Sequence, residues 1–187
     1  MTEKAILSWI NVNLCSTIER ALVKAKEKFP DHPYTKDWLA GMAMRETGFK
    51  IAEFNELGKS PEIIHQVMRG DYGQRKGETE KSYHGFGYWQ IDVGSYPDFV
   101  KSGAWKDPFK TCLKAIEVLE EKRLYLVPKF PNLQGDSLYR AITAAYNCGQ
   151  GNVAKVLNEG KDIDARTYNH DYSAEVWRFR EVFNSLQ

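Results

Sequence analysis

The sequence lacks the features that identify disulfide scaffolds, zinc modules and proteins drawn to polyanions. Its three cysteines, Cys15, Cys112 and Cys148, are far apart, odd in number and without C-x-x-C spacing, so we expect neither a disulfide framework nor a zinc site. The 26 basic and 25 acidic residues leave a formal charge of +1. Such a balance provides no general attraction to nucleic acid or to an anionic membrane.

The amino-terminal stretch MTEKAILSWINVNLCSTIER contains no long apolar run. Asn11 and Asn13 interrupt it, no basic region precedes it, and no small-residue cleavage site follows it. We therefore expect no signal peptide and no transmembrane helix.

Several common catalytic motifs are also missing. The sequence has no G-x-S-x-G elbow, no phosphate-binding G-x-x-x-x-G-K and no dinucleotide fingerprint. The histidines His32, His65, His84 and His170 show no paired ligand spacing, so we expect no catalytic metal and no cofactor. Cys148 has no nearby base and is expected to be structural.

The composition fits one compact domain that is mainly α-helical (α+β). Of its 187 residues, 42% are hydrophobic and 13% aromatic, which is enough for a sizeable core. We expect residues 1–187 to form a single domain, with amino-terminal helices over 1–34 and a catalytic core over 35–187.

Helix signals dominate the chain. Ser16 and Glu19 form a capping-box pattern that predicts a helix up to Pro30. Thr35 is placed to cap a second helix, and Gly48 to end it in a left-handed conformation. Further helix signals occur at 61–69, 108–126, 136–147 and from 152, and an amphipathic pattern follows Asp171. Between 71 and 92 we expect a loop and then a small β-ribbon.

Glu46, in GMAMRETGFK, is a candidate general acid. The expected carboxyl end of a helix, together with Met42, Met44 and Phe49, would raise its pKa by the helix dipole and by desolvation. The alternative interpretation is a surface glutamate paired with a neighbouring Arg45 or Lys50.

A second segment, GFGYWQID at 85–92, adds groups that suit a carbohydrate. Gln90 offers an amide, and Asp92 offers a second carboxylate on a different element. Phe86 and Tyr88 are aromatic and either stack on sugar rings or simply fill the core. Two carboxylates flanking a glycosidic bond are the minimum equipment for its hydrolysis.

A third segment, AAYNCGQGNV at 144–153, places Tyr146 and Asn147 before a glycine-containing turn. In this order RETGF, GFGYWQID and AAYNCGQGNV resemble the three motifs of goose-type lysozymes and the related soluble lytic transglycosylases. The segment YNHDYSAEVWRFREVF at 168–183 resembles the terminal Asp-Tyr-Ala segment of the goose-type branch. The similarity extends from about residue 35 onward.

This resemblance implies a lysozyme-like fold, a helical domain with a small β-ribbon beside an active-site cleft. It implies a substrate with β-1,4-linked N-acetylated sugars, such as peptidoglycan or chitin. By position, Glu46 would be the catalytic acid and Asp92 would position the attacking water. The predicted substrate-binding residues are Gln90, Tyr146, Asn147, Tyr88, Phe86, His84 and Tyr172.

The sequence departs from the goose-type pattern at two positions. Lys81 stands where that branch has a second aspartate, and Tyr96 where it often has a histidine. Asp71, Glu78 or Glu80 would have to replace the missing acid, although KGETEK is more typical of a solvated charge run.

Four functions therefore stay open. They are an inverting muramidase, a lytic transglycosylase that needs only Glu46, a chitinase, and a glycan-binding module without activity. We expect a monomer without membrane insertion. An inhibitor or immunity protein stays open as a partner. A substrate in the cell wall would require secretion, or release as an endolysin or effector.

Overall fold

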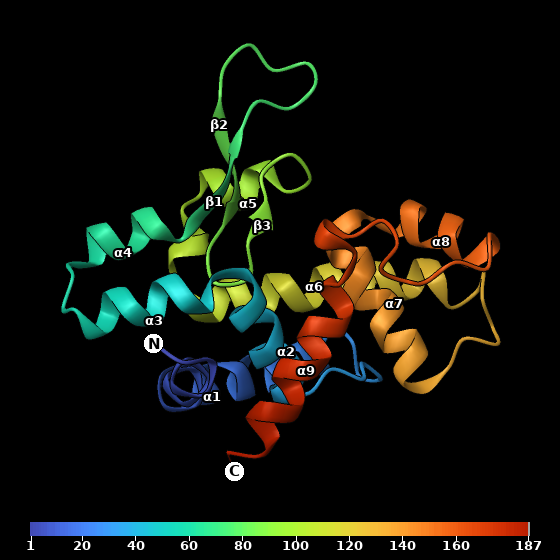
Figure 1. Ribbon diagram of the computed structural model, residues 1–187, viewed down its shortest axis with the longest axis horizontal. Helices are drawn as coiled ribbons and strands as arrows, with labels where there is room; N and C mark the ends of the chain where they lie inside the picture. The colour runs from blue at the N-terminus through green and yellow to red at the C-terminus, as the bar shows by residue number, and fades with distance from the viewer. Residues whose placement is uncertain (187) are drawn as a thin grey trace.

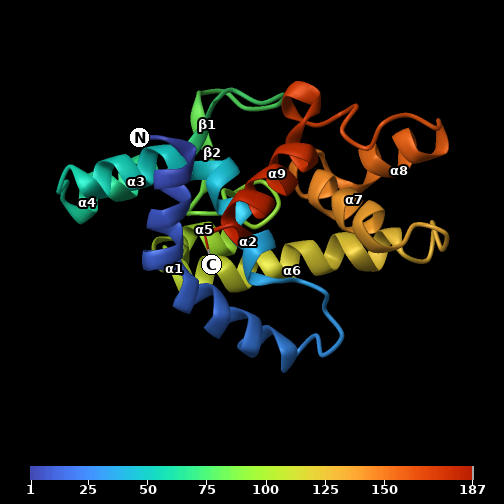
Figure 2. The same ribbon diagram turned by 60° about the horizontal axis from the view of Figure 1, so that its bottom comes forward.

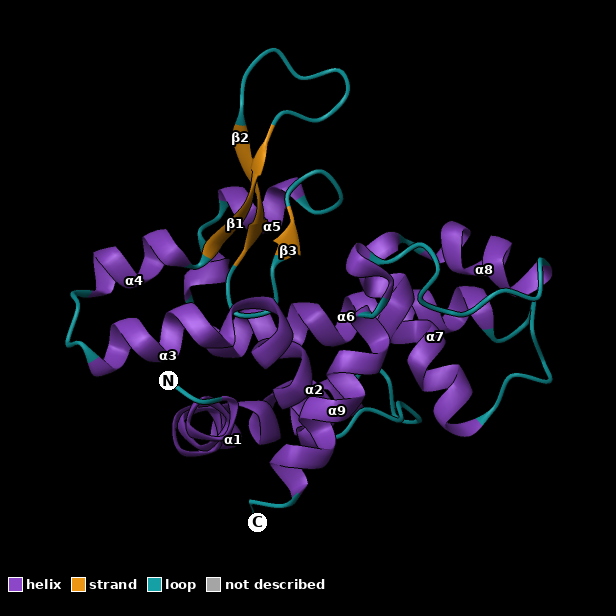
Figure 3. Cartoon of the chain, in the orientation of Figure 1, coloured by secondary structure: helices purple, strands orange, loops and turns teal. Residues whose placement is uncertain are grey.

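The computed structural model describes residues 1–186, apart from the side chain of Phe49, and consists of a helical body that carries a small antiparallel sheet (Figures 1 and 3). The helices are α1 (Glu3–Lys26), α2 (Lys36–Ala43), α3 (Phe49–Glu56), α4 (Pro61–Val67), α5 (Pro97–Lys101), α6 (Pro108–Leu126), α7 (Gly135–Cys148), α8 (Gln150–Asn158) and α9 (Tyr172–Asn184). The strands are β1 (Arg69–Gly73), β2 (Ser82–Phe86) and β3 (Ile91–Asp92), in the order β1-β2-β3. Short π and 3-10 turns occur at Met44–Gly48 (η1), Ala104–Lys106 (η2) and Tyr168–His170 (η3). This architecture confirms the predicted helical, lysozyme-like class.

The core lies where α2 packs against α1 and α9, and α1 packs in turn against the long α6 (Figure 2). Trp38 of α2 is 1% exposed, and its indole nitrogen donates a hydrogen bond to Thr143 of α7 at 2.9 Å. Gly41 lets α9 approach closely, because a Cβ there would lie 2.7 Å from the carbonyl oxygen of Val176. Burying these apolar faces is the main stabilisation available to a chain without disulfides.

The first helix begins earlier than predicted. Ser16 does not cap this helix but lies inside α1. The N-cap of α1 is Thr2, whose side chain accepts a hydrogen bond from Ala5 N. Buried residues recur at helical spacing through this region: Ile6, Leu7, Ile10, Leu14, Ile18, Ala21 and Ala25. This continuous apolar stripe outweighs the local capping pattern.

The second helix does not end at Gly48. Thr35 is the N-cap of α2 as expected, but η1 then carries the chain directly into α3, and Gly48 has a helical φ of −51°. A Cβ on Gly48 would lie 2.9 Å from the sulfur of Met44 and 3.3 Å from Ile6 of α1. Gly48 therefore serves close packing rather than termination.

The other predicted elements are mostly present. Asp107 caps α6, accepting hydrogen bonds from Phe109 N and Lys110 N, and α6 ends at Leu126 as expected. The amphipathic helix after Asp171 is α9. The helix predicted at 61–69 is shorter, because α4 ends at Val67 and Arg69 already belongs to β1. Among residues 1–186, no helix combines the length and the apolar character needed to cross a bilayer.

The sheet is built around a pair of facing glycines. β1 and β2 are antiparallel, with Gly70 opposite Gly85, and β3 pairs with the end of β2. A Cβ on Gly70 or Gly85 would lie 2.1 Å or 2.5 Å from the amide oxygen of Gln90. The glycines thus leave room for the Gln90 side chain across the two strands.

Candidate active site

A cleft of about 780 Å³ lies between the sheet and the segment that leads into α9. Residues from η1, all three strands, α6, α7, η3 and α9 line it. Six of the predicted site residues are among them: Glu46, Gln90, Asp92, Tyr146, Asn147 and Tyr172.

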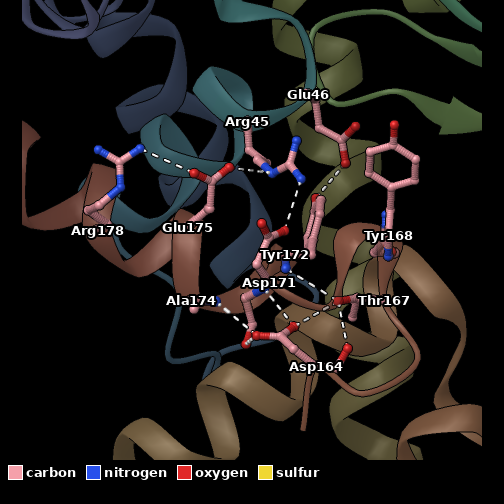
Figure 4. A network of polar contacts seen from close by, with 12 residues as sticks. Arg45, Glu46, Asp164, Thr167, Tyr168, Asp171, Tyr172, Ala174, Glu175 and Arg178 are labelled. Carbon is pink, nitrogen blue, oxygen red and sulfur yellow. Dashed lines mark hydrogen bonds and ion pairs between the residues drawn. The ribbon is translucent and has the colours of Figure 1, made fainter.

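Glu46 projects into this cleft from the π-helical turn η1. Its carboxylate accepts a hydrogen bond from the Tyr172 hydroxyl, as Figure 4 shows. Burial raises the pKa of Glu46 to about 7, although the Tyr172 hydrogen bond and the Arg45 charge act in the opposite direction. A carboxyl with this pKa is largely protonated in mildly acidic solution and can donate a proton.

The sequence predicts the direction of this pKa change, but only one of its two causes is present. Glu46 is not at a helix end, since the chain continues through η1 into α3. The helix dipole therefore does not act as expected, and desolvation is the principal cause. Met42 and Met44 are fully buried nearby in the chain, whereas the side chain of Phe49 lies outside the described part. A π-helical turn at this position is a common feature of functional sites.

Arg45 does not form the ion pair with Glu46 that the alternative interpretation requires. It turns toward α9 and pairs with Asp171 (Nη2–Oδ1 3.3 Å) and Glu175 (Nε–Oε2 3.1 Å), as Figure 4 shows. Its guanidinium also lies 5.6 Å from the centre of the Tyr172 ring. Arg45 thus connects η1 to the start of α9 while Glu46 faces the cleft.

Tyr172 is held in place by a buried capping network at the start of α9. The carboxylate of Asp164, which is 0% exposed, accepts hydrogen bonds from the backbone of Ser173 (2.8 Å) and Ala174 (3.0 Å). Thr167 Oγ1 donates to Asp164 and accepts from Tyr172 N at 3.3 Å (Figure 4). Burial would raise the pKa of Asp164, but these hydrogen bonds outweigh it and lower the pKa. Asp164 therefore fixes the residue that contacts the candidate acid.

Asp92 ends β3 as an ionised carboxylate. It pairs with Arg75 (Nη1–Oδ1 2.5 Å) and accepts a hydrogen bond from Ser95 N at 2.7 Å. Partial burial would raise the pKa of Asp92, but Arg75 and Ser95 outweigh it and lower the pKa below its usual range. Asp71 pairs with the same guanidinium (Nη2–Oδ2 2.7 Å). The cleft therefore contains a protonatable glutamate and an anionic aspartate on different elements.

The predicted binding residues that reach the cleft are held mainly by backbone groups. Gln90, with a φ of +47°, donates two hydrogen bonds of 2.9 Å to the carbonyls of Met68 and Gly87. The Tyr146 hydroxyl donates to the carbonyl of Trp89 at 2.6 Å, and Asn147 Oδ1 accepts from the backbone nitrogen of Tyr168 at 2.9 Å. These contacts place their side chains in the walls of the cleft.

Three predicted binding residues do not line the cleft. The Phe86 ring packs against Trp105, with 5.3 Å between centroids, and belongs to a small apolar cluster. Tyr88 packs on the core, and its carbonyl accepts a hydrogen bond from Thr47. His84 is 1% exposed and is enclosed by polar partners. This geometry does not support direct contacts of these side chains with a sugar.

Other cleft residues were missing from the predicted set. Arg75, Lys122 and Tyr168 line the cleft, and burial lowers the pKa of Lys122. On α6, Lys122 lies one helical turn after Val118, which also lines the cleft. This spacing is the one local signal that could have indicated that Lys122 faces the cleft. Arg75 lies in a loop and Tyr168 in the three-residue turn η3, and neither is long enough for a periodic pattern to indicate which way the side chain points.

The departures from the goose-type pattern have structural counterparts. Lys81 is exposed outside the cleft, and the Tyr96 hydroxyl donates to Glu121 at 2.6 Å. Glu78 is not part of a freely solvated charge run, because its carboxylate accepts a hydrogen bond from His84 at 2.8 Å. Glu80 is exposed. Of the three candidate replacement acids, only Asp71 lines the cleft.

The chain is similar in sequence to two goose-type lysozymes from fish. The chain is 29% identical over 132 residues to lysozyme g from Takifugu rubripes, a match that covers 65% of this chain and 67% of that protein. It is 29% identical over 126 residues to lysozyme g from Epinephelus coioides, covering 67% of this chain but only 60% of that protein. No protein-family model matches the chain. These matches, together with the helical fold and the cleft, support a distant relationship of the chain to the goose-type lysozymes.

Proposed function

We propose that the protein is a glycoside hydrolase that cleaves the β-1,4 bond between N-acetylmuramic acid and N-acetylglucosamine in peptidoglycan. The observation that carries this proposal is Glu46, a carboxyl with a pKa of about 7 in a cleft that also contains the anionic Asp92. Two carboxyl groups with pKa values on opposite sides of the usual range suit an acid and its partner in glycosidic cleavage.

Glu46 acts as the general acid. Its proton moves to the glycosidic oxygen as the bond from that oxygen to the sugar carbon breaks, and the electron pair of that bond leaves with the oxygen. The carboxylate that results keeps the hydrogen bond from Tyr172, which favours the ionised form. Tyr172 therefore stabilises Glu46 after the proton has left.

Asp92 positions the attacking water. Arg75 and Ser95 N each occupy one acceptor position on its two oxygens. A carboxylate has about four such positions, so Asp92 retains capacity for a water molecule. A water held there and attacking the face of the sugar opposite the leaving group would give inversion.

A lytic transglycosylase is the second candidate. The Arg75 ion pair lowers the pKa of Asp92 and so makes it a weaker proton acceptor. A transglycosylase needs no water-activating base, because a hydroxyl of the substrate closes an anhydro ring. In that reaction Asp92 would only contact the substrate.

Mass spectrometry of the fragments released from purified peptidoglycan tests both candidates. We expect reducing-end muropeptides with the wild-type protein and none with Glu46→Gln. Glu80→Gln, the same change at an exposed glutamate of the β1–β2 loop, is the matched control and should leave the products unchanged. Anhydro-muropeptides would favour the transglycosylase. In that case Asp92→Asn should reduce the rate of cleavage less than it would if the protein were a hydrolase, because no water has to be positioned. Absence of fragments from all variants would refute peptidoglycan cleavage.

A further inference from the structure

Arg75 reaches from the loop between β1 and β2 into the cleft. Its Nη1 lies 2.5 Å from Asp92 Oδ1, and its Nη2 lies 2.7 Å from Asp71 Oδ2. One guanidinium therefore joins the last residue of β3 to a residue of β1. Its planar fork of donors suits such a bridge better than the single ammonium of a lysine does.

Glu78 fixes the loop segment that carries Arg75. Its Oε2 accepts a hydrogen bond from Arg75 N at 2.7 Å, and its backbone carbonyl accepts one from the Gln74 amide at 2.7 Å. The same carboxylate lies 2.8 Å from Nε2 of His84. Arg75 is thus attached at its backbone to a carboxylate that is itself attached to β2.

His84 anchors this arrangement from inside the protein. The side chain is buried, and Nδ1 lies 2.7 Å from the carbonyl oxygen of Asp71. A carbonyl and a carboxylate can only accept hydrogen bonds, so satisfying both requires a proton on each ring nitrogen. Burial alone would lower the pKa of His84, but the hydrogen bonds to Asp71 and Glu78 outweigh it and raise the pKa. The contacts form a closed ring through Asp71, His84, Glu78 and Arg75.

We propose that Arg75 is a positioning residue that holds the Asp92 carboxylate in the cleft, and that Arg75 is anchored by Glu78 together with the buried His84. This inference rests on the proposed function of Asp92. The ring around Arg75 keeps the guanidinium over Asp92 although the arginine side chain itself is 44% exposed. An isolated ion pair that is this exposed would contribute little free energy to fixing the position of Asp92.

Other charged or titratable groups also face Asp92. Asp71 shares Arg75 with it, and Lys122 of α6 and Tyr96 lie close enough to interact with its charge. Lys122 is a second cation, so it keeps part of the stabilisation when Arg75 is removed. An adjacent arginine typically lowers an aspartate pKa by about 1 to 3, and we expect Arg75→Gln to raise the pKa of Asp92 by about one pH unit.

The pH dependence of peptidoglycan cleavage tests the proposal. Arg75→Gln should move the acidic limb, set by Asp92, upward by about one pH unit and leave the alkaline limb, set by Glu46, in place. Arg75→Lys should move the acidic limb by a smaller amount, because lysine keeps the positive charge but lacks the planar fork of donors of the guanidinium. Lys76→Gln removes a neighbouring exposed charge and should not move either limb. A loss of rate that is equal at every pH would mean a merely structural contribution and would overturn the proposal.

A second measurement does not depend on turnover. The carboxyl carbon of Asp92 can be titrated by ¹³C NMR in the wild type, in Arg75→Gln and in Glu78→Gln. We expect Arg75→Gln to raise its midpoint, and Glu78→Gln to raise it by a smaller amount because Arg75 loses its anchor. An unchanged midpoint in Arg75→Gln overturns the proposal. Absence of cleavage by the wild type, together with a shifted midpoint, would refute the proposed function but leave the positioning of Asp92 by Arg75 supported.

Discussion

The partly buried Glu46 carboxyl should make the stability of the protein depend on pH in a way that Glu46→Gln removes. The pKa of Glu46 rises from an ordinary 4.5 to about 7 on folding. The folded state therefore holds this proton more tightly than the unfolded chain does. The corresponding stability is fully present below pH 4.5 and is lost as the pH rises to about 7.

The size of this effect follows from the pKa difference. At about 1.4 kcal/mol per pH unit, it corresponds to about 3 kcal/mol. Glutamine resembles the neutral acid in shape and can still accept the Tyr172 hydrogen bond, so the variant should match the wild type near pH 4.5. By pH 8 it should be more stable than the wild type by about 3 kcal/mol.

Urea unfolding at pH values from about 4.5 to about 8 measures this difference. Other titrating groups are common to both proteins and cancel when the two free energies of unfolding are subtracted. Glu80→Gln, at an exposed position, controls for the general effect of removing one negative charge. A Glu46→Gln advantage that does not grow with pH would refute the argument that burial keeps this carboxyl protonated.

Three other substitutions test the parts of the site. Tyr172→Phe removes a hydrogen bond that favours ionised Glu46, so the alkaline limb of the pH–activity profile should move upward by about one pH unit; a downward move would contradict this. Gly85→Ala places a Cβ 2.5 Å from the Gln90 amide oxygen. The displaced amide loses its two backbone hydrogen bonds, and urea unfolding should show a loss of about 1 to 3 kcal/mol, whereas no loss would mean that Gln90 moves freely. Asp164→Ala leaves the start of α9 without its buried acceptor and should reduce the free energy of unfolding by about 3 kcal/mol or more. A change below about 1 kcal/mol would show that Asp164 does not hold this end of α9.

Elements with local start and stop signals were predictable from the sequence. The start of α6 follows from Asp107 as cap and Pro108 in the first turn, and both act within a few residues. The continuation of α2 through η1 was not predictable. It depends on Gly48 packing under α1, a contact between segments about forty positions apart.

The residues of the candidate site also fall into those that could be predicted from the sequence and those that could not. Glu46, Asp92 and Tyr146 occur in short motifs whose chemistry can be recognised directly, and all three line the cleft. Arg75 and Asp164 act only through partners distant in the sequence or through the path of a loop. The fold thus supplies the surroundings that set the pKa values, whereas the motifs supply the titrating groups.

The contact between Glu46 and Tyr172 also bears on the order in which the protein can become functional during synthesis. The two residues are 126 positions apart, so a nascent chain that has emerged only as far as α8 contains the candidate acid without its hydroxyl partner. Domains generally fold as units. The environment that raises the pKa of Glu46 is complete only after α9 has docked beside α2. The proposed role of Glu46 therefore requires α9 to be in place, and a chain made only as far as α8 lacks the Tyr172 hydroxyl that contacts this carboxyl.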